Sequence, residues 1–229
     1  MRKSLQISLT AVFAALHAIL YFMSFGLWRN WGIYLESIEG IILGPEVGFL
    51  AAIIGSSIGR MIKPDPLWMF GIIAEPISVL SAGLLTKAQW KPVLAIYGTM
   101  LAAYFIIPYG GTALPLWTIL DILLALFLIY PTAKLSKNLF RTDIKHLSIA
   151  LILISFVCIA TDSLIRVFLL VPVGLHSLFF ASFTELEAVF VGAAFDSYIE
   201  DLIVVTVSFI VGVPLLISIS KLGLFKKNR

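Results

Sequence analysis

The sequence predicts an all-α fold, a polytopic bundle of helices in a membrane, and three observations lead to this prediction. Hydrophobic residues fill 60% of the 229 positions and only 13% are charged, whereas a soluble domain carries about 25% charged residues. The mean hydropathy is +1.05. Apolar runs of roughly 17–25 residues recur along the chain, and a helix of that length crosses ~30 Å of hydrocarbon. We therefore expect a multi-pass protein of the cell (plasma) membrane.

The first span is expected over residues 4–25, directly after the basic residues Arg2 and Lys3. Its apolar stretch is long for a signal peptide, and no Ala-x-Ala cleavage site follows it. We therefore expect this helix to be retained as a membrane span.

The next apolar stretch, residues 33–62, is interrupted by Gly44 and Pro45. Proline removes a backbone donor and clashes with the preceding helical turn, and glycine readily ends a helix. An unbroken helix would be ~45 Å long and would place Glu46 in lipid, at a cost on the order of 3 kcal/mol. We therefore expect two spans, residues 31–43 and 46–62, joined by a cytoplasmic turn. A single span here, giving seven helices instead of eight, is the alternative.

Charged loops place the remaining five spans, at residues 67–86, 92–107, 115–135, 146–171 and 197–222. Three segments are rich in Lys and Arg, as cytoplasmic loops are: Lys87 to Lys91, Lys134 to Lys145, and the tail from Lys221. Two spans separate each of these segments from the next, so the three assignments agree with one another.

We expect one transmembrane domain over residues 1–229. Residues 1–140 hold the first six spans, and residues 141–229 hold two further spans with an acidic outer segment at residues 172–196. That segment contains three acidic residues but no Lys or Arg. With eight spans, the N- and C-termini are both cytoplasmic.

Several of these features together resemble the substrate-binding S components of energy-coupling factor (ECF) transporters. They are the basic N-terminus, an alanine-rich first helix, an outer loop, and the run from Glu39 to Gly48 (EGIILGPEVG). The resemblance covers residues 1–91 with some specificity and the rest only as a general pattern. Since the family typically has six membrane helices, it implies a six-helix core to which two spans are added.

The resemblance implies a subunit that binds a small molecule, a vitamin or related micronutrient, for ATP-driven uptake. Such a subunit docks in the lipid bilayer on a membrane coupling protein that is driven by two cytoplasmic ATPase subunits. The family's docking alanines are matched here by Ala11, Ala14, Ala15 and Ala18. Alanines four apart share a helix face and let another backbone approach closely. Internal packing within this chain is the alternative use of that face.

Ionisable residues inside a membrane are costly, so each is a candidate for substrate binding. Asp162 and Arg166 can pair with each other on one helix. Glu75 and Asp121 have no such partner, so either a tertiary partner or a polar cavity must accommodate them, and we favour the cavity. Glu39 lies on the short second helix. The acidic residues hint at a cationic or zwitterionic ligand, but Arg29, Arg60, Lys63 and Arg166 on the same side weaken that hint.

The outer loop before the second span groups Trp28, Arg29, Trp31 and Tyr34. Aromatic rings beside an arginine could hold a flat ligand at the mouth of a pocket. The alternative is an interfacial aromatic belt, which accounts for most such residues.

The sequence contains no HExxH motif, Cys/His cluster or P-loop, so we expect no enzyme activity, catalytic residue, metal or cofactor. Its basic residues lie in short loops, which argues against nucleic acid. The run from Gly55 to Gly59 matches G-x-S-x-G, but it lies on an apolar helix instead of the strand-to-helix elbow that this chemistry requires. The main alternative function is a stand-alone, proton-coupled secondary transporter that uses an intramembrane carboxylate.

Overall fold

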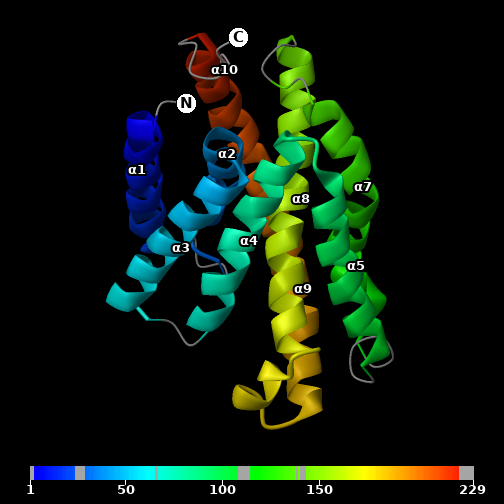
Figure 1. Cartoon of the computed structure of the whole chain (residues 1–229). Coiled ribbons are helices and arrows are strands. Elements are labelled where there is room, and N and C mark those ends of the chain that lie inside the picture. Colours follow the sequence, from blue (N-terminus) through cyan, green and yellow to red (C-terminus); the bar gives the residue numbers. More distant parts are fainter. Residues whose placement is uncertain are drawn as a thin grey trace.

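The structure is a computed structural model that describes residues 3–23, 29–64, 67–107, 114–137, 139 and 143–221, and every regular element in these ranges is helical (Figure 1). In chain order the elements are α1 (Lys3–Tyr21), α2 (Ile33–Leu43), α3 (Pro45–Ile62), α4 (Trp68–Thr86), α5 (Trp90–Ile106), the 3₁₀ turn η1 (Leu116–Ile119), α7 (Leu120–Ser136), α8 (Ile144–Leu170), the 3₁₀ turn η2 (Leu175–Leu178), α9 (Phe183–Val207), the π segment η3 (Ser208–Gly212) and α10 (Val213–Lys221). The start of α1 and the end of α10 lie at the same end of the bundle.

Six helical stretches among the described residues are long and apolar enough to cross a membrane: α1, α3, α4, η1 with α7, α8, and α9 continued through α10. The prediction of a multi-pass helical membrane protein is therefore confirmed at this level. The expected count of eight is not reached, because α5 has 17 residues and α2 only 11. At 1.5 Å per residue, α2 extends ~16 Å, about half the hydrocarbon thickness.

The stretch from residue 33 to residue 62 is two helices, and the alternative of one unbroken helix is wrong. Helix α2 ends at Leu43 and α3 begins at Pro45, with Gly44 between them at φ 82°, a conformation that favours glycine. The turn packs against α4, where a Cβ added to Gly83 would lie 2.5 Å from the Pro45 nitrogen. Glu46 beside the turn pairs with Lys87, with 3.7 Å between Oε2 and Nζ.

Helices α4 and α8 form the centre of the bundle, and α1 and α9 lie at its periphery (Figure 1). Small and branched side chains such as Ala74, Ala82, Ile154 and Ile159 are fully buried there. Helix α2 is enclosed by α3, α4 and α8, and ten of its eleven residues are buried. Its short length is therefore compatible with a membrane, because protein instead of lipid surrounds it.

The last helix begins at Phe183, fourteen residues before the expected start at residue 197. The reason is a capping box. The Ser182 hydroxyl accepts the Glu185 backbone N–H at 3.3 Å, and the Glu185 carboxylate accepts the Ala181 N–H at 2.9 Å. Much of the segment predicted as an acidic outer loop, residues 172–196, is therefore helical. The π segment η3 ends two residues before Pro214, which lacks the N–H that a regular helix needs.

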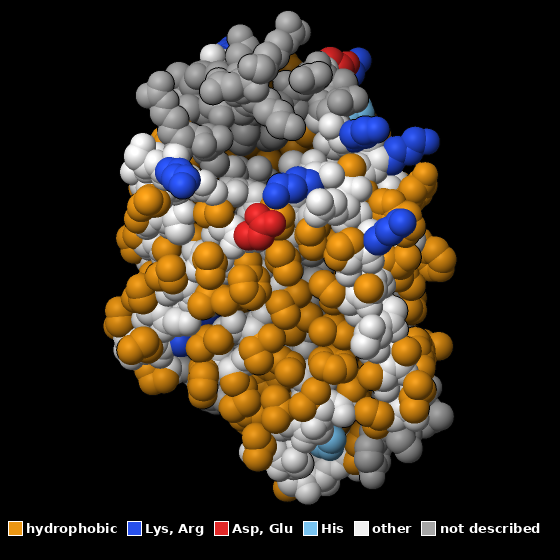
Figure 2. All heavy atoms as spheres, viewed as in Figure 1, with side chains coloured by type: hydrophobic (Ala, Val, Ile, Leu, Met, Phe, Trp, Pro, Cys, Tyr) orange, Lys and Arg blue, Asp and Glu red, His pale blue; other side chains and the backbone are white. Residues whose placement is uncertain are grey.

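Figure 2 shows one face of the molecule, with hydrophobic side chains covering most of its height. Most of the Lys, Arg, Asp and Glu side chains seen on this face lie toward the end at which α1 begins and α10 ends. Large apolar side chains point outward, including Met61, Ile106 and Phe127, each more than three-quarters exposed. Such a surface is stable against lipid tails and not in water.

Candidate functional site

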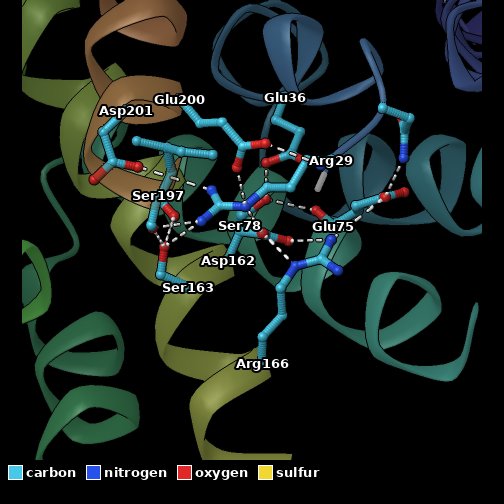
Figure 3. A network of polar contacts seen from close by, with 12 residues as sticks. Arg29, Glu36, Glu75, Ser78, Asp162, Ser163, Arg166, Ser197, Glu200 and Asp201 are labelled. Carbon is cyan, nitrogen blue, oxygen red and sulfur yellow. Dashed lines mark hydrogen bonds and ion pairs between the residues drawn. The ribbon is translucent and has the colours of Figure 1, made fainter. Parts of the chain in front are cut away.

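The bundle encloses a chain of ion pairs contributed by α1, the segment before α2, α2 itself, α3, α4, α8 and α9 (Figure 3). We call it the ionic network; its members are His17, Arg29, Glu39, Arg60, Glu75, Asp162, Arg166, Glu200 and Asp201. All of these side chains are nearly or fully inaccessible except that of Arg166, which is 24% exposed. Charges enclosed in this way are stable only when partners satisfy them.

Glu75, on α4, lies at the centre of the ionic network. Arg60 donates to both of its carboxylate oxygens, Nη1 to Oε2 at 3.0 Å and Nη2 to Oε1 at 2.5 Å. The Asn30 amide donates to Oε1 at 3.0 Å, and a ring nitrogen of His17 lies 3.1 Å from Oε2. The other ring nitrogen of His17 lies 3.2 Å from Glu39. His17 therefore bridges two carboxylates from different helices.

Glycines on α3 and α4 make room for these contacts. A Cβ added to Gly71 would lie 1.6 Å from Arg60 Nη2, so only glycine leaves space for the guanidinium. A Cβ added to Gly55 would lie 2.6 Å from His17, and one added to Gly59 would lie 2.7 Å from Tyr21. The small residues Gly55 and Gly59 of α3 thus serve packing against α1.

Arg166 and Arg29 continue the network from α8 to α9. Arg166 donates to Asp162 through Nε at 2.6 Å, which is the predicted pairing along one helix turn. Arg29 lies 3.6 Å from Asp162 and 3.0 Å from Glu200, and its guanidinium donates to Ser163 and Ser197 at 2.9 and 2.8 Å. Its backbone N–H also donates to Glu200 at 2.9 Å. The segment that precedes α2 is thereby fastened to α8 and α9.

The ionic network holds more carboxylates than cations. Five acidic residues face three arginines and one histidine, so one carboxylate is in excess even with His17 charged. Two further buried acids, Glu36 and Asp121, form no ion pair with any described residue. An excess of negative charge in a medium of low dielectric is stable only when some carboxyl groups carry protons or a cation is bound.

Glu36 is fully buried, and within the described chain its only hydrogen-bond partner is the hydroxyl of Ser78. The Ser78 oxygen also lies 2.7 Å from the carbonyl oxygen of Glu75. A serine hydroxyl has one hydrogen, so it cannot donate to both acceptors at once. A protonated Glu36 that donates to Ser78, which in turn donates to the Glu75 carbonyl, satisfies all three groups.

Beside the ionic network lies a cavity of about 840 Å³, at the end of the bundle opposite the termini. Its charged lining consists of Arg29, Arg60, Lys63, Arg166, Asp121 and Glu200. Its apolar lining combines aliphatic side chains with the aromatic rings of Tyr21, Phe70, Phe179, Phe180 and Phe190. The rings of Phe70 and Phe179 are in contact, with their centroids 5.8 Å apart.

The structure places the predicted site residues in two overlapping groups. Arg29, Asp121 and Arg166 line the cavity, and Arg29 and Arg166 also belong to the ionic network. Glu39, Glu75 and Asp162 belong to the network without lining the cavity. Glu75 is thus held by tertiary partners instead of facing a cavity as expected.

The described aromatic residues of the predicted outer-loop cluster, Trp31 and Tyr34, do not line the cavity. Trp31 and Tyr34 are in edge contact, with centroids 6.2 Å apart, and pack with Ile33, Ile159 and Val204. Trp28 lies outside the described residues.

The alanines predicted to dock a partner lie on two faces of α1. Ala14 and Ala18 are buried, and the Ala14 carbonyl is closely approached by Gly55 of α3. They are therefore used for internal packing. Ala11 and Ala15 are exposed, so docking of a partner through these two residues stays a prediction.

Sequence reasoning did not find His17, Arg60 and Glu200 as members of this site. Glu200 was expected at the start of the last helix, but it lies in the interior of α9. His17 lies against the G-x-S-x-G helix, a proximity that was not expected, yet both of its ring nitrogens are engaged by carboxylates and not by a serine. No signal in the sequence links these residues, because their partners are distant along the chain.

Comparisons with known proteins give one distant relative. An uncharacterized protein of Methanocaldococcus jannaschii is 29% identical over 134 residues, which is 57% of this chain and 44% of that protein. The chain thus matches less than half the length of that relative. No protein-family model matches the chain, and no solved structure matches it.

Proposed function

We propose that this protein is a membrane-embedded substrate-binding subunit for ATP-driven uptake of a vitamin or related micronutrient, located in the plasma membrane. The observation that carries the proposal is the cavity of about 840 Å³, which falls within the ~300–1,000 Å³ of small-molecule sites and combines apolar walls with a few charged groups. It lies at the end of the bundle away from the basic loops. A solute would reach it from the outer side.

The proposal includes a separate coupling protein and two ATPase subunits, because the sequence carries no nucleotide-binding motif of its own. Helix α1 is the docking element that we propose. It lies at the periphery of the bundle, and Ala11 and Ala15 on its exposed face would let a second helix approach closely.

Copurification from native membranes tests this proposal. We expect the tagged full-length protein to bring with it a membrane coupling protein and ATPases, and Ala11→Leu with Ala15→Leu to reduce their recovery. The matched control is Val12→Leu, which adds bulk to another exposed position of α1. Ligand binding should be unchanged in all variants. Solute uptake into liposomes by the purified protein alone, driven by an ion gradient, would overturn the ATP-driven mechanism.

Glu36 favours a second candidate, a stand-alone secondary transporter coupled to protons. Its hydrogen-bond arrangement supports a carboxylic acid that holds a proton in the interior of the bundle, linked through Ser78 to the backbone carbonyl of Glu75. Glu75 and Asp162, two other intramembrane carboxylates, are paired with arginines. Under this function, Glu36→Gln would abolish uptake driven by a pH gradient while leaving counterflow exchange of solute intact.

A further inference from the structure

We propose that the ligand of the cavity is an organic anion, with an acidic head group held by Lys63 and Arg166 and an apolar, partly aromatic body. This inference rests on the proposed function, because it names the substrate class for the same cavity. It departs from the cationic or zwitterionic ligand that the acidic residues of the sequence suggested.

The accessible charge in the cavity is positive. Lys63 is exposed at the end of α3, and the Arg166 side chain is 24% exposed. The two carboxylates in the lining are far less accessible, with Asp121 at 7% and Glu200 at 2%. Because Coulomb interactions with a ligand act most directly through the groups it can touch, an entering solute meets two cations first.

These cations keep donors for a ligand. Lys63 forms no ion pair with any described carboxylate, and Arg166 uses Nε and Nη2 on Asp162, so Nη1 is not engaged by the described residues. Asp162 and Glu75, which neutralise the guanidinium groups, have no accessible surface and do not line the cavity. They orient Arg166 from behind without occupying the position of a ligand acid group.

The rest of the lining fits an apolar body. Aliphatic and aromatic side chains line much of the cavity. They include Val167, Leu170, Phe179, Phe180 and Phe190. Rings arranged around a cavity bind a flat apolar group by stacking and edge contacts.

Three probes with the same body test the head group: 2-naphthylacetate, 2-naphthylacetamide and 2-(2-naphthyl)ethylammonium. The full-length protein is placed in nanodiscs of phosphatidylcholine, and binding is measured by calorimetry against empty nanodiscs. We expect the carboxylate to bind on the order of tenfold more tightly than the amide, the effect of one charge-assisted hydrogen-bonded contact. The ammonium probe should bind most weakly.

Variants test whether Lys63 and Arg166 cause the preference for the carboxylate probe. Lys63→Gln should remove most of the preference for the carboxylate. Arg166→Gln is combined with Asp162→Asn, so that no buried carboxylate is left without its partner. The control is Lys145→Gln, an exposed lysine at the other end of α8, which should leave all three affinities unchanged.

The outcomes separate this inference from the proposed function. If the amide or the ammonium probe binds as tightly as the carboxylate, the inference of an anionic ligand is wrong, whereas the proposal of a solute-binding cavity is retained. If no probe binds above the empty nanodiscs, the cavity is not a solute site and both fail. Competition by phosphatidylglycerol in the nanodiscs, lost in Lys63→Gln, would identify the anion as a lipid head group. If phosphatidylglycerol leaves the affinity for the carboxylate probe unchanged, the anion is identified as a soluble acid.

Discussion

Glu36 and Ser78 share a hydrogen bond in which the serine cannot be the donor if it also satisfies the carbonyl of Glu75. Both side chains are fully buried, on α2 and α4. We predict that Glu36 carries the hydrogen between the two side chains, so that Ser78 can donate to the Glu75 carbonyl.

Infrared spectroscopy checks this assignment. We expect a protonated carboxylic acid band near neutral pH that loses intensity in Glu36→Gln, because the amide replaces the acid while still donating to Ser78. Glu200→Gln is the control, since that carboxylate is ion-paired with Arg29 and its removal should leave the band unchanged. A band of unchanged intensity in Glu36→Gln would assign the proton to other groups.

Arg60 and Glu75 should behave as a unit in unfolding. Removing either partner leaves a charge buried without compensation, so Glu75→Ala or Arg60→Ala should lower the free energy of unfolding by about 3–5 kcal/mol. The double variant should be destabilised by clearly less than the sum of the two single variants. Denaturant unfolding in detergent measures the cycle, and strict additivity would contradict a direct interaction.

Gly71 should tolerate no side chain. A Cβ at this position would overlap Arg60 Nη2 and displace it from Glu75, so Gly71→Ala should lower the melting temperature measurably. Gly98→Ala is the matched control, because no atom lies within 4 Å of a Cβ added there. In the interior of helix α5, that change should stabilise the protein by about 0.5–1 kcal/mol. Equal effects of the two substitutions would argue against the Arg60 contact.

The orientation of the bundle can be read by thiol labelling. Glu46 lies beside Lys87 at the end that we predict to be cytoplasmic, and Lys63 lies at the opposite end of α3. In intact cells, a membrane-impermeant reagent should label Lys63→Cys but not Glu46→Cys, which should react only after lysis. The native Cys158 is buried and should give little background. The reverse pattern would invert the topology.

The sequence predicted the helices well because their determinants are local. Apolar runs and the Gly44-Pro45 break placed most helices to within a few residues, including the turn between α2 and α3. The start of α9 was missed although its signal is also local. The capping box from Ser182 to Glu185 lies within a stretch that was predicted to be an outer loop because of its acidic residues.

The site was predictable only in part, because its contacts are not local. The pairing of Asp162 with Arg166 follows from helical spacing, and it was found. The pairing of Arg60 with Glu75 joins two helices, and the bridge from His17 to Glu39 joins two others. Such pairs depend on how the helices pack, and a single sequence contains no record of that packing.

The burial of α2 has a consequence for how the protein enters the membrane during synthesis. This helix is too short to span alone and carries two carboxylates, each costing about 3 kcal/mol at the centre of a bilayer. Helix α4, which carries Ser78, and helix α8 both pack against α2. Both follow α2 in the chain and therefore leave the ribosome after it. Stable insertion of α2 therefore has to wait for them. A chain that stops after Ile62 should leave this segment accessible from the aqueous phase.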